Sequence, residues 1–468
     1  MNSFTIYKSL PIWLQNVLVN IKGQMLQRER YGGCYRRVYD ALCRSEHWSA
    51  RQIEAYKTEQ LKRILTYAYA HCPYYKRKFD EAGVAPADFN VLADLQKFPI
   101  LTKAEVREHW HEMLSDEADR KSLLLYHTSG STGTPLNFYW TRESLQYYWA
   151  VVWRGRRRVG VHRGDLHLNF TGKLVVPLGQ SKPPYWRYNK ALNQYMLNMQ
   201  HISPEKVADI VRFINDKHFK FFVGYPSIIY SLALLCNRMG LQITAAPKYI
   251  FTSAEKMYGH QRAMIEKVFR GSIVMEHYGF SEEAACACKC PHGMYHEDFE
   301  MGHLELYRPE HTERGLTGRM LATGFQNLGM PFIRYEIGDT ATFSLQPCPC
   351  GLHSQTIVDI EGRNEDYILT SEGTRYTRLD YLLKDVSNVA ETQIVQREKG
   401  KIVLRIVPLP GYSKEENESK IKALVREKFS ATLQVGFEYV DSIGRTKAGK
   451  FKYIVNEMNT ITPPRINT

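Results

Sequence analysis

The sequence predicts an α/β protein with two parts, a large N-terminal region (residues 1–362) and a small mobile α+β domain (residues 363–468). Its 468 residues suggest about two to four domains of ordinary size. Strand and helix patterns alternate between residues 200 and 340, which is typical of a parallel sheet with crossover helices. After Glu361-Gly362-Arg363 the pattern changes to short alternating strands, so we expect the domain boundary at 362–366.

Each element of the expected parallel sheet follows from local spacing. Short apolar runs about 25 residues apart indicate parallel strands, and apolar residues at helical spacing lie between them. The expected strands are 219–223, 249–252 and 273–276, and the expected helices begin at Ser203-Pro204-Glu205 and span 227–239 and 260–269. Ligands on such sheets bind at the carboxyl ends of the strands. Candidate ligand-binding segments are therefore 224–227, 253–255 and 277–279.

The two ends of the chain give weaker patterns. Near the N-terminus, residues 49–70 have helical spacing. In the last hundred residues we expect strands at 401–407 and 435–439 and a helix at 414–428.

Composition limits the classes of partner. The 62 Lys and Arg residues exceed the 49 Asp and Glu residues, which gives a net charge of +13. A basic chain favours anionic partners such as nucleotides, phosphates, nucleic acid or an acidic membrane surface. The sequence has no helix-turn-helix, RNP or zinc-finger spacing, so we expect no nucleic-acid partner.

Cysteine usage and the N-terminus predict a cytoplasmic protein. Five of the nine cysteines lie between Cys286 and Cys350, which favours a metal site over disulfide bridges. The segment 4–25 resembles neither a signal peptide nor a transmembrane helix, because polar residues interrupt it.

The first helix has an apolar stripe at helical spacing, with basic residues beside it. The stripe consists of Trp13, Val17, Leu18, Ile21 and Met25. The flanking basic residues are Lys8, Lys22, Arg28 and Arg30. One interpretation is peripheral association with an anionic membrane, and the other is a helix docked on the protein's own core. We favour the docked helix, because any helix that faces a core shows one such stripe. A homodimer is also compatible with this sequence.

The sharpest local motif is the run of hydroxyl and glycine residues Thr128-Ser129-Gly130-Ser131-Thr132-Gly133-Thr134-Pro135. Two glycines allow consecutive N–H groups to face one ligand, and the hydroxyls add short donors, so such a loop can surround phosphate oxygens. It lacks the Gly-Lys-Ser/Thr ending of the common P-loop. A plain polar turn is the alternative interpretation.

In this context the loop resembles the phosphate-binding signature of the adenylate-forming superfamily, which includes acyl-CoA synthetases, luciferases and adenylation domains. Four further motifs follow in the order that this superfamily shows. They are Tyr278-Gly279-Phe280-Ser281-Glu282, Tyr335-Glu336-Ile337-Gly338-Asp339, Glu361-Gly362-Arg363 and Arg445-Thr446-Lys447-Ala448-Gly449-Lys450. Segments 70–75, 224–227 and 348–351 resemble the phenylacetate–CoA ligase family, and in particular its branch associated with capsular polysaccharide biosynthesis.

The resemblance implies a role for each motif residue in binding ATP and Mg²⁺. The phosphates of ATP would be held by Ser129, Gly130, Ser131, Thr132, Gly133 and Thr134, with Thr132 also catalytic. The adenine side would be formed by Ser253, Ala254, Glu255, His277, Tyr278 and Gly279. Glu282 would bind Mg²⁺, Asp339 the ribose hydroxyls, and Arg363 the ribose or a phosphate. Lys450 would stabilise charge on the α-phosphate when the small domain closes.

The implied reaction is ATP-dependent activation of a small carboxylic acid to an acyl-adenylate, followed by thioester formation with CoA. The stretch 369–376 lacks the Arg-Gly-x-Asn pattern that helps to build the second-step site in CoA ligases of this family. An acceptor other than CoA, such as an amine or a sugar hydroxyl of a glycan, is therefore an alternative. A non-catalytic nucleotide-binding partner protein is a further one.

A second set of residues indicates zinc. Seven candidate ligands are available for four places, namely Cys286, Cys288, Cys290, His292, His296, Cys348 and Cys350. The quartet Cys290, His296, Cys348 and Cys350 is one reasonable choice, and its role would be structural because a closed four-ligand site leaves no open position. Free thiols are the alternative.

The basic cluster Arg154, Arg156, Arg157 and Arg158 follows two tryptophans. It would suit an anion site for a substrate carboxylate or a phosphate. We favour a solvated helix face.

Overall fold

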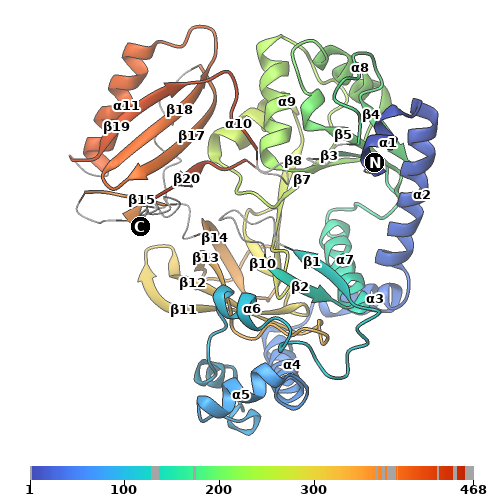
Figure 1. Cartoon of the computed structure of the whole chain (residues 1–468), viewed down its shortest axis with the longest axis vertical. Coiled ribbons are helices and arrows are strands. Elements are labelled where there is room, and N and C mark those ends of the chain that lie inside the picture. Colours follow the sequence, from blue (N-terminus) through green and yellow to red (C-terminus); the bar gives the residue numbers. More distant parts are fainter. Residues whose placement is uncertain are drawn as a thin grey trace, which may run out of the picture.

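A long mixed sheet with helices on both faces forms most of the molecule, and a smaller sheet with one helix forms a separate lobe beside it (Figure 1). The computed structural model describes residues 3–127, 136–171, 175–363, 367–371, 375–376, 386, 388–428, 432–445 and 451–458.

The α-helices are α1 (Ser3–Ser9), α2 (Ile12–Tyr31), α3 (Tyr35–Ser45), α4 (Ala50–His71), α5 (Pro73–Glu81), α6 (Lys103–His109), α7 (Arg142–Arg157), α8 (Val207–Lys217), α9 (Pro226–Arg238), α10 (Gly259–Val268) and α11 (Lys414–Lys428). The 3₁₀ helices are η1 (Pro86–Asp88), η2 (Leu92–Lys97), η3 (Lys190–Leu192) and η4 (Met199–His201).

The strands of the N-terminal region are β1 (Leu124–His127), β2 (Asn137–Trp140), β3 (His167–Thr171), β4 (Trp186–Asn189), β5 (Gln194–Asn198), β6 (Phe221–Gly224), β7 (Tyr249–Ser253), β8 (Ile273–Gly279), β9 (Cys286–Lys289), β10 (Tyr295–Glu297), β11 (Gly302–Thr312), β12 (Gly315–Gly324), β13 (Tyr335–Phe343) and β14 (Thr356–Arg363). Those that follow are β15 (Ile368–Leu369), β16 (Arg375–Tyr376), β17 (Val389–Glu398), β18 (Lys401–Pro408), β19 (Gln434–Tyr439) and β20 (Ile454–Asn456).

The long sheet joins a parallel half to an antiparallel half. Within the described residues its twelve strands run β11-β12-β13-β14-β10-β9-β8-β7-β6-β3-β5-β4. Strands β5, β3, β6, β7 and β8 are parallel neighbours, and from β8 to β11 every pairing is antiparallel. The predicted parallel sheet is thus present, and the junction of the two halves lies at β8.

Helices cover both faces of the parallel half, as crossover connections require. One face packs on α8, α9 and α10 through a core that includes Phe222 and Ile250. The other face packs on α3 and α7 through a core that includes Phe221 and Phe251. Neighbouring strand residues alternate between the two cores because successive side chains point to opposite faces.

Most predicted elements are present with small shifts in their bounds. Helix α4 begins where predicted, and Ser49 caps it: its Oγ accepts from the Gln52 N–H at 3.4 Å while the Gln52 side chain accepts from the Ser49 N–H at 3.0 Å. One start was wrong. We expected a helix from Ser203, but residues 203–206 form a turn, and α8 begins at Val207.

The smaller lobe is a four-stranded sheet in the order β19-β18-β17-β20 with its own core, at the upper left of Figure 1. Its strands β18 and β19 and its helix α11 are the elements predicted for the C-terminal domain. The predicted boundary at 362–366 begins inside β14, which ends at Arg363, and it stays a prediction.

The docked-helix interpretation of the N-terminal stripe is wrong. All five stripe residues are exposed, and the polar face of α2 packs inward instead. Gln15 accepts from Arg187 Nε at 3.0 Å, and Asn20 accepts from the Lys190 N–H at 2.7 Å. Among the helices that the structure describes, none combines the length and apolarity needed to cross a membrane.

Acid sensitivity should arise in part from His167, which lies buried on β3. Its ring stacks on Phe221 at 4.4 Å, and burial lowers its pKa to about 3. A histidine whose pKa falls on folding stabilises the fold above its unfolded value near 6.5, and that stability is lost as the pH falls toward 3. Between pH 7 and pH 5 the free energy of unfolding should therefore drop by about 2 kcal/mol through this group.

We expect His167→Gln to reduce this difference when urea unfolding is compared at the two pH values. His162→Gln changes an exposed imidazole and is the matched control. Equal pH dependence in wild type and His167→Gln would contradict the assignment.

Candidate functional site

The candidate site lies where the carboxyl ends of β6 and β7 meet the smaller lobe. Glu255 follows β7 in a turn whose Ala254 has a φ of 68°. Glu255 Oε2 accepts from the Ser227 N–H at 3.2 Å, and Oε1 accepts from the Phe451 N–H at 2.7 Å. One carboxylate therefore joins two strand-end segments of the N-terminal region to the residue that directly follows Lys450.

Hydrogen bonds offset only part of the cost of burying the Glu255 carboxylate. Burial raises the pKa of this carboxyl, while the hydrogen bonds from Phe451 and Ser227 act in the opposite direction. Two further contacts between the N-terminal region and the smaller lobe involve tyrosines. Tyr230 Oη donates to the Ala390 carbonyl at 3.1 Å, and the rings of Tyr258 and Tyr453 lie 4.7 Å apart.

Two tyrosine–carboxylate pairs connect the central motifs. Tyr278 Oη donates to Asp339 Oδ2 at 2.6 Å, and Tyr335 Oη donates to Glu282 Oε1 at 2.5 Å. Both members of the second pair are buried. Each motif thus supplies one tyrosine and one carboxylate, and the tyrosine of each motif binds the carboxylate of the other. These bonds orient Asp339 and Glu282, the two acids that we predicted to bind ribose and Mg²⁺.

The register of β13 and β14 brings a third motif to the same place. Asp339 on β13 lies opposite Arg363 on β14. Gly338 has a φ of 93°, and a Cβ there would lie 2.9 Å from Lys103 Nζ. The sequence analysis missed Lys103, because nothing in the local sequence before α6 marks it as a neighbour of the Asp339 motif.

His277 lies inside β8 rather than after it, and its ring is held at both nitrogens. Nδ1 lies 3.2 Å from Cys288 Sγ, and Nε2 lies 3.3 Å from Tyr148 Oη. Burial lowers the pKa of His277 to about 4, so the ring is neutral near pH 7. The contact with Tyr148 connects the motif to α7, which sequence reasoning did not predict.

Glu283 is a second residue that the sequence analysis missed. It has a φ of 51°, which is rare for a residue with a side chain. Its Oε2 is buried and has no hydrogen-bond partner among the described residues. Burial holds the pKa of this carboxyl well above its usual value.

The four residues of the predicted zinc quartet come together. One ligand atom from each of Cys290, His296, Cys348 and Cys350 lies within 4.8 Å of all the others. His296 Nε2 is 3.2 Å from Cys350 Sγ, and the sulfurs of Cys290 and Cys348 are 3.6 Å apart. The cluster joins β9 and β10 to the loop that precedes β14.

The chemistry of this cluster fits a thiophilic cation. Burial lowers the pKa of His296 to about 4, so the imidazole is neutral and able to coordinate a cation. Burial raises the pKa of the Cys290 and Cys348 thiols, which would lose their protons on binding a metal ion. Its Nδ1 is buried without a hydrogen-bond partner in the described part of the chain. Three thiols and one neutral imidazole are a common donor set for structural zinc.

Of the four residues in the arginine cluster, only Arg157 is exposed, and the others lie against acids or aromatic rings of the protein itself. Arg154 is 1% exposed, and its guanidinium lies 2.8 Å from Asp298 and 3.0 Å from Glu300. Arg157 and Arg158 both pair with Glu46. Arg156 lies over three aromatic rings, those of Trp153, Phe221 and Phe251.

The expectation of a solvated face was wrong for Arg154. A run of charged residues on a helix does not show whether buried acids from elsewhere in the chain will pair with it. Those acids lie far along the chain, after β10.

The phosphate loop and the lysine motif fall outside the described residues. The loop residues Ser129, Gly130, Ser131, Thr132, Gly133 and Thr134 are among them, as is Lys450. The strands on either side of the loop, β1 and β2, pair antiparallel with His127 opposite Asn137.

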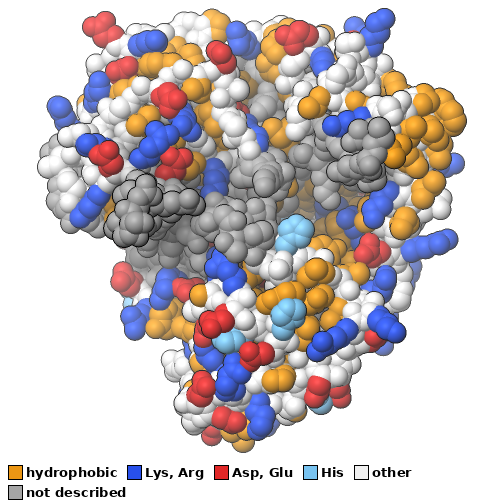
Figure 2. Space-filling model, in the orientation of Figure 1, with side chains coloured by type: hydrophobic (Ala, Val, Ile, Leu, Met, Phe, Trp, Pro, Cys, Tyr) orange, Lys and Arg blue, Asp and Glu red, His pale blue; other side chains and the backbone are white. Residues whose placement is uncertain are grey.

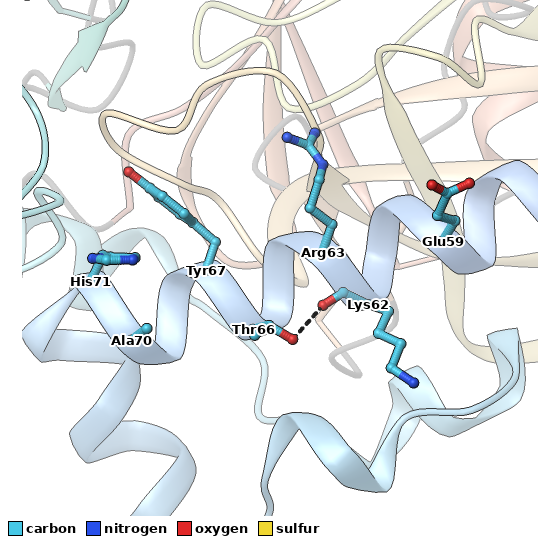
Figure 3. Close-up of a pocket in the computed structure, with 7 residues that line it drawn as sticks. All are labelled: Glu59, Lys62, Arg63, Thr66, Tyr67, Ala70 and His71. Carbon is cyan, nitrogen blue, oxygen red and sulfur yellow. Dashed lines mark hydrogen bonds between the residues drawn. The ribbon is translucent and has the colours of Figure 1, made fainter.

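An open groove on α4 is separate from this site. Figure 3 shows its lining, which comes from one helix between Glu59 and His71. Several polar groups there have local partners: Arg63 Nη2 donates to the Phe325 carbonyl at 2.7 Å, and Tyr67 Oη lies 2.7 Å from Ser115 Oγ. Of the segments named in the sequence analysis as resembling known families, only 70–75 contributes to it, through Ala70 and His71.

Comparison with known proteins supports the class that these motifs predict. The phenylacetate-coenzyme A ligase of Thermus thermophilus is 26% identical over 365 residues, which cover 75% of this chain and 79% of that protein. A crystal structure of 2-hydroxyisobutyryl-CoA ligase, in the postadenylation state with R3-HIB-AMP, matches with a TM-score of 0.69 at 19% identity and covers 89% of this chain and 92% of that one. The chain therefore has the fold of the adenylate-forming ligases, and the predicted resemblance to that superfamily is confirmed.

Within that class, the sequence points to one more specific group. Residues 368–457 match the CapK C-terminal domain. Protein CapK of Staphylococcus aureus is 25% identical over 457 residues, which cover 97% of this chain and 99% of that protein. The chain thus carries a CapK C-terminal domain on an adenylate-forming fold.

We expect Arg154→Ala to lower the free energy of unfolding by about 3–5 kcal/mol, because it leaves Asp298 and Glu300 buried without their cation. Arg157→Ala, on the same helix but exposed, should change it by less than about 1 kcal/mol. Urea unfolding of both variants measures the difference. Equal midpoints for the two variants would show that the buried arginine does not neutralise these acids.

Proposed function

We propose that the protein activates a small carboxylic acid with ATP and forms an acyl-adenylate, which it passes to an acceptor. The carboxylate oxygen of the acid attacks the α-phosphorus, the bond from that phosphorus to the bridging oxygen breaks, and pyrophosphate leaves. This reaction demands positioning and charge neutralisation more than covalent chemistry from the protein.

One observation carries the proposal. The residue after Lys450 donates a backbone hydrogen bond to Glu255, the acid of the turn after β7. Phe451, which follows the C-terminal lysine motif in sequence, and a strand-end segment of the parallel sheet are distant along the chain, yet they meet at one carboxylate. A closed lobe that delivers a cation to a nucleotide at the strand ends requires this proximity.

The described residues have distinct roles in this proposal. The turn 253–255 and Tyr278 would border the adenine, and Asp339 would accept hydrogen bonds from the ribose hydroxyls. The bond from Tyr278 to Asp339 leaves that carboxylate oriented before the nucleotide binds. Arg363, opposite Asp339, would reach the ribose or a phosphate.

Glu282 fits Mg²⁺, which prefers carboxylate oxygens. Its carboxylate is buried and its Oε1 is held by Tyr335, so it lies in a fixed position. The ion would neutralise the phosphate charge during attack on the α-phosphorus. The loop at 128–135 would hold the remaining phosphate oxygens.

The acceptor is the open part of the function. CoA is the first candidate, as the names of the phenylacetate-CoA and 2-hydroxyisobutyryl-CoA ligases suggest. A non-CoA acceptor, such as an amine or a sugar hydroxyl, is the second. It is favoured by the match of residues 368–457 to the CapK C-terminal domain and by the missing Arg-Gly-x-Asn pattern at 369–376.

We further propose that the Cys290, His296, Cys348 and Cys350 cluster holds a structural zinc ion. All four places would be filled by protein, so the ion would stabilise the β9–β10 hairpin and the loop before β14 without entering the reaction.

Release of pyrophosphate from ATP, measured with a panel of aryl, fatty, hydroxy and amino acids, tests adenylation. We expect release that depends on one class of acid. An increase on adding CoA would identify CoA as the acceptor, and no response would direct the search to amines and sugars. No acid-dependent release with any member of the panel would count against the proposal.

With an acid that supports release, Lys450→Ala should slow adenylation by about two to three orders of magnitude, the scale for losing one positioned charge. Lys401→Ala changes an exposed lysine of the same lobe and should leave the rate unchanged. An unaltered rate in Lys450→Ala would remove this residue from the site.

Metal analysis of the purified protein should find about one zinc ion per chain. Cys350→Ser should lower both the zinc content and the melting temperature, because metal binding contributes to folding. Cys43→Ser, a cysteine of α3 outside the cluster, is the control. Full zinc content in Cys350→Ser would exclude this quartet.

A further inference from the structure

Helix α2 turns its apolar face to solvent. Trp13 is 67% exposed, Met25 57% and Ile21 54%, and Val17 and Leu18 are exposed with them. Figure 2 shows hydrophobic side chains gathered on the outer side of the molecule, over α2 at the right-hand edge. At 3.6 residues per turn these five residues fall within an arc of about 140°. They form a continuous stripe, which we call the α2 stripe.

Contacts on the inner face of α2 fix the rotation of the helix about its axis, and therefore fix the α2 stripe toward solvent. Gly23 on the inner face lies so close to the sheet edge that a Cβ would come within 2.1 Å of Asn189 Oδ1. Asn20 donates to the Tyr188 carbonyl at 3.1 Å and accepts from the Lys190 N–H. Gln15 is buried against the guanidinium of Arg187. A rotated helix would lose all these contacts.

The charges along the α2 stripe as far as residue 28 are all positive, and the one acid of α2, Glu29, follows the stripe and is half-buried. Residues 1–28 contain no Asp or Glu, whereas Lys8, Lys22 and Arg28 are all exposed. Lys22 lies at the edge of the α2 stripe and Arg28 at its C-terminal end. Arg30 is not part of this surface, because its guanidinium lies 4.2 Å over the Trp149 ring.

We propose that the α2 stripe docks on the surface of an anionic lipid bilayer, with α2 lying in the plane of the interface. An exposed apolar face with a basic border is the pattern of interfacial helices. Trp13 is of the residue type that prefers the boundary between headgroups and acyl chains. The lysines and Arg28 meet lipid phosphates, and they outnumber Glu29, the one acid of α2.

Charge complementarity favours this occupant over a second copy of the chain. In a symmetric dimer through the α2 stripe, the same surface would meet itself, and Lys22 and Arg28 would face like charges. An anionic bilayer offers both the apolar layer and the opposite charge. The docking does not depend on the proposed adenylation, since no residue of the candidate site lies on α1 or α2.

Flotation of the full-length protein with vesicles tests the proposal. We expect binding to vesicles of phosphatidylcholine mixed with phosphatidylglycerol and little binding to phosphatidylcholine alone. Trp13→Ser combined with Ile21→Gln should abolish flotation. Lys22→Gln combined with Arg28→Gln should weaken binding about thirtyfold, because each basic residue near an anionic surface contributes to it.

Matched controls distinguish the loss of the α2 stripe from a loss of folding. Val91→Gln changes an apolar residue that is 55% exposed outside α2 and should leave flotation unchanged. All variants should keep the wild-type melting temperature and circular dichroism, because the substituted side chains are exposed.

Three outcomes would overturn the proposal. The first is no flotation of wild type with anionic vesicles, and the second is flotation that persists in Trp13→Ser/Ile21→Gln. The third is a wild-type dimer in sedimentation velocity that this double variant converts to monomer, since the α2 stripe would then belong to a second copy. Equal binding to neutral vesicles would overturn the role of charge.

Discussion

The fold depends on a short buried acidic segment, residues 297–300, which runs from the last residue of β10 toward β11, because several helices are attached to the sheet through it. Glu297 is bound by Lys57 from α4 at 2.7 Å, and Arg154 from α7 spans Asp298 and Glu300. Ser45 at the end of α3 donates to Glu300 at 2.5 Å. Three carboxylates without these partners would be very costly to bury, so α3, α4 and α7 must dock together for the segment to fold inside.

The acidic segment also connects the helices to the cysteine cluster and to the motif on β8. It begins one residue after His296 of the cysteine cluster, and Asp298 accepts from Cys286 across 3.6 Å on the strand that leads back to His277. A chain of short contacts therefore runs from the buried acids through β9 to β8 and its motif. The smaller lobe meets the N-terminal region at Glu255, after strand β7 of the same sheet.

Sequence reasoning predicted what depends on local pattern and failed where partners come from far along the chain. The parallel strands and α4 follow from periodicity. Residue type and spacing left seven candidates for a metal cluster, and the structure brings the predicted quartet Cys290, His296, Cys348 and Cys350 together. Arg154 was misassigned because its acids lie more than a hundred residues away. The α2 stripe was misassigned because periodicity shows that a helix has an apolar face but not which way that face points. Lys103 and Tyr148 carry no local signal at all. The roles of the phosphate loop and Lys450 stay predictions, since both lie outside the described residues.

The inverted packing of α2 has a thermodynamic consequence. Its inner face is attached partly by hydrogen bonds, such as those of Asn20 and Gln15, which water can replace, and the five residues of the α2 stripe are already hydrated. Lifting α2 from the sheet would expose further apolar surface only from half-buried side chains, such as Leu14, Val19 and Leu26, and from Tyr31. Because heat capacity changes and urea sensitivity both scale with the surface newly exposed, such an opening would show a small heat capacity change and a weak dependence on urea. In amide hydrogen exchange, α2 should therefore behave as a local unit, separate from the global unfolding of the sheet that carries it.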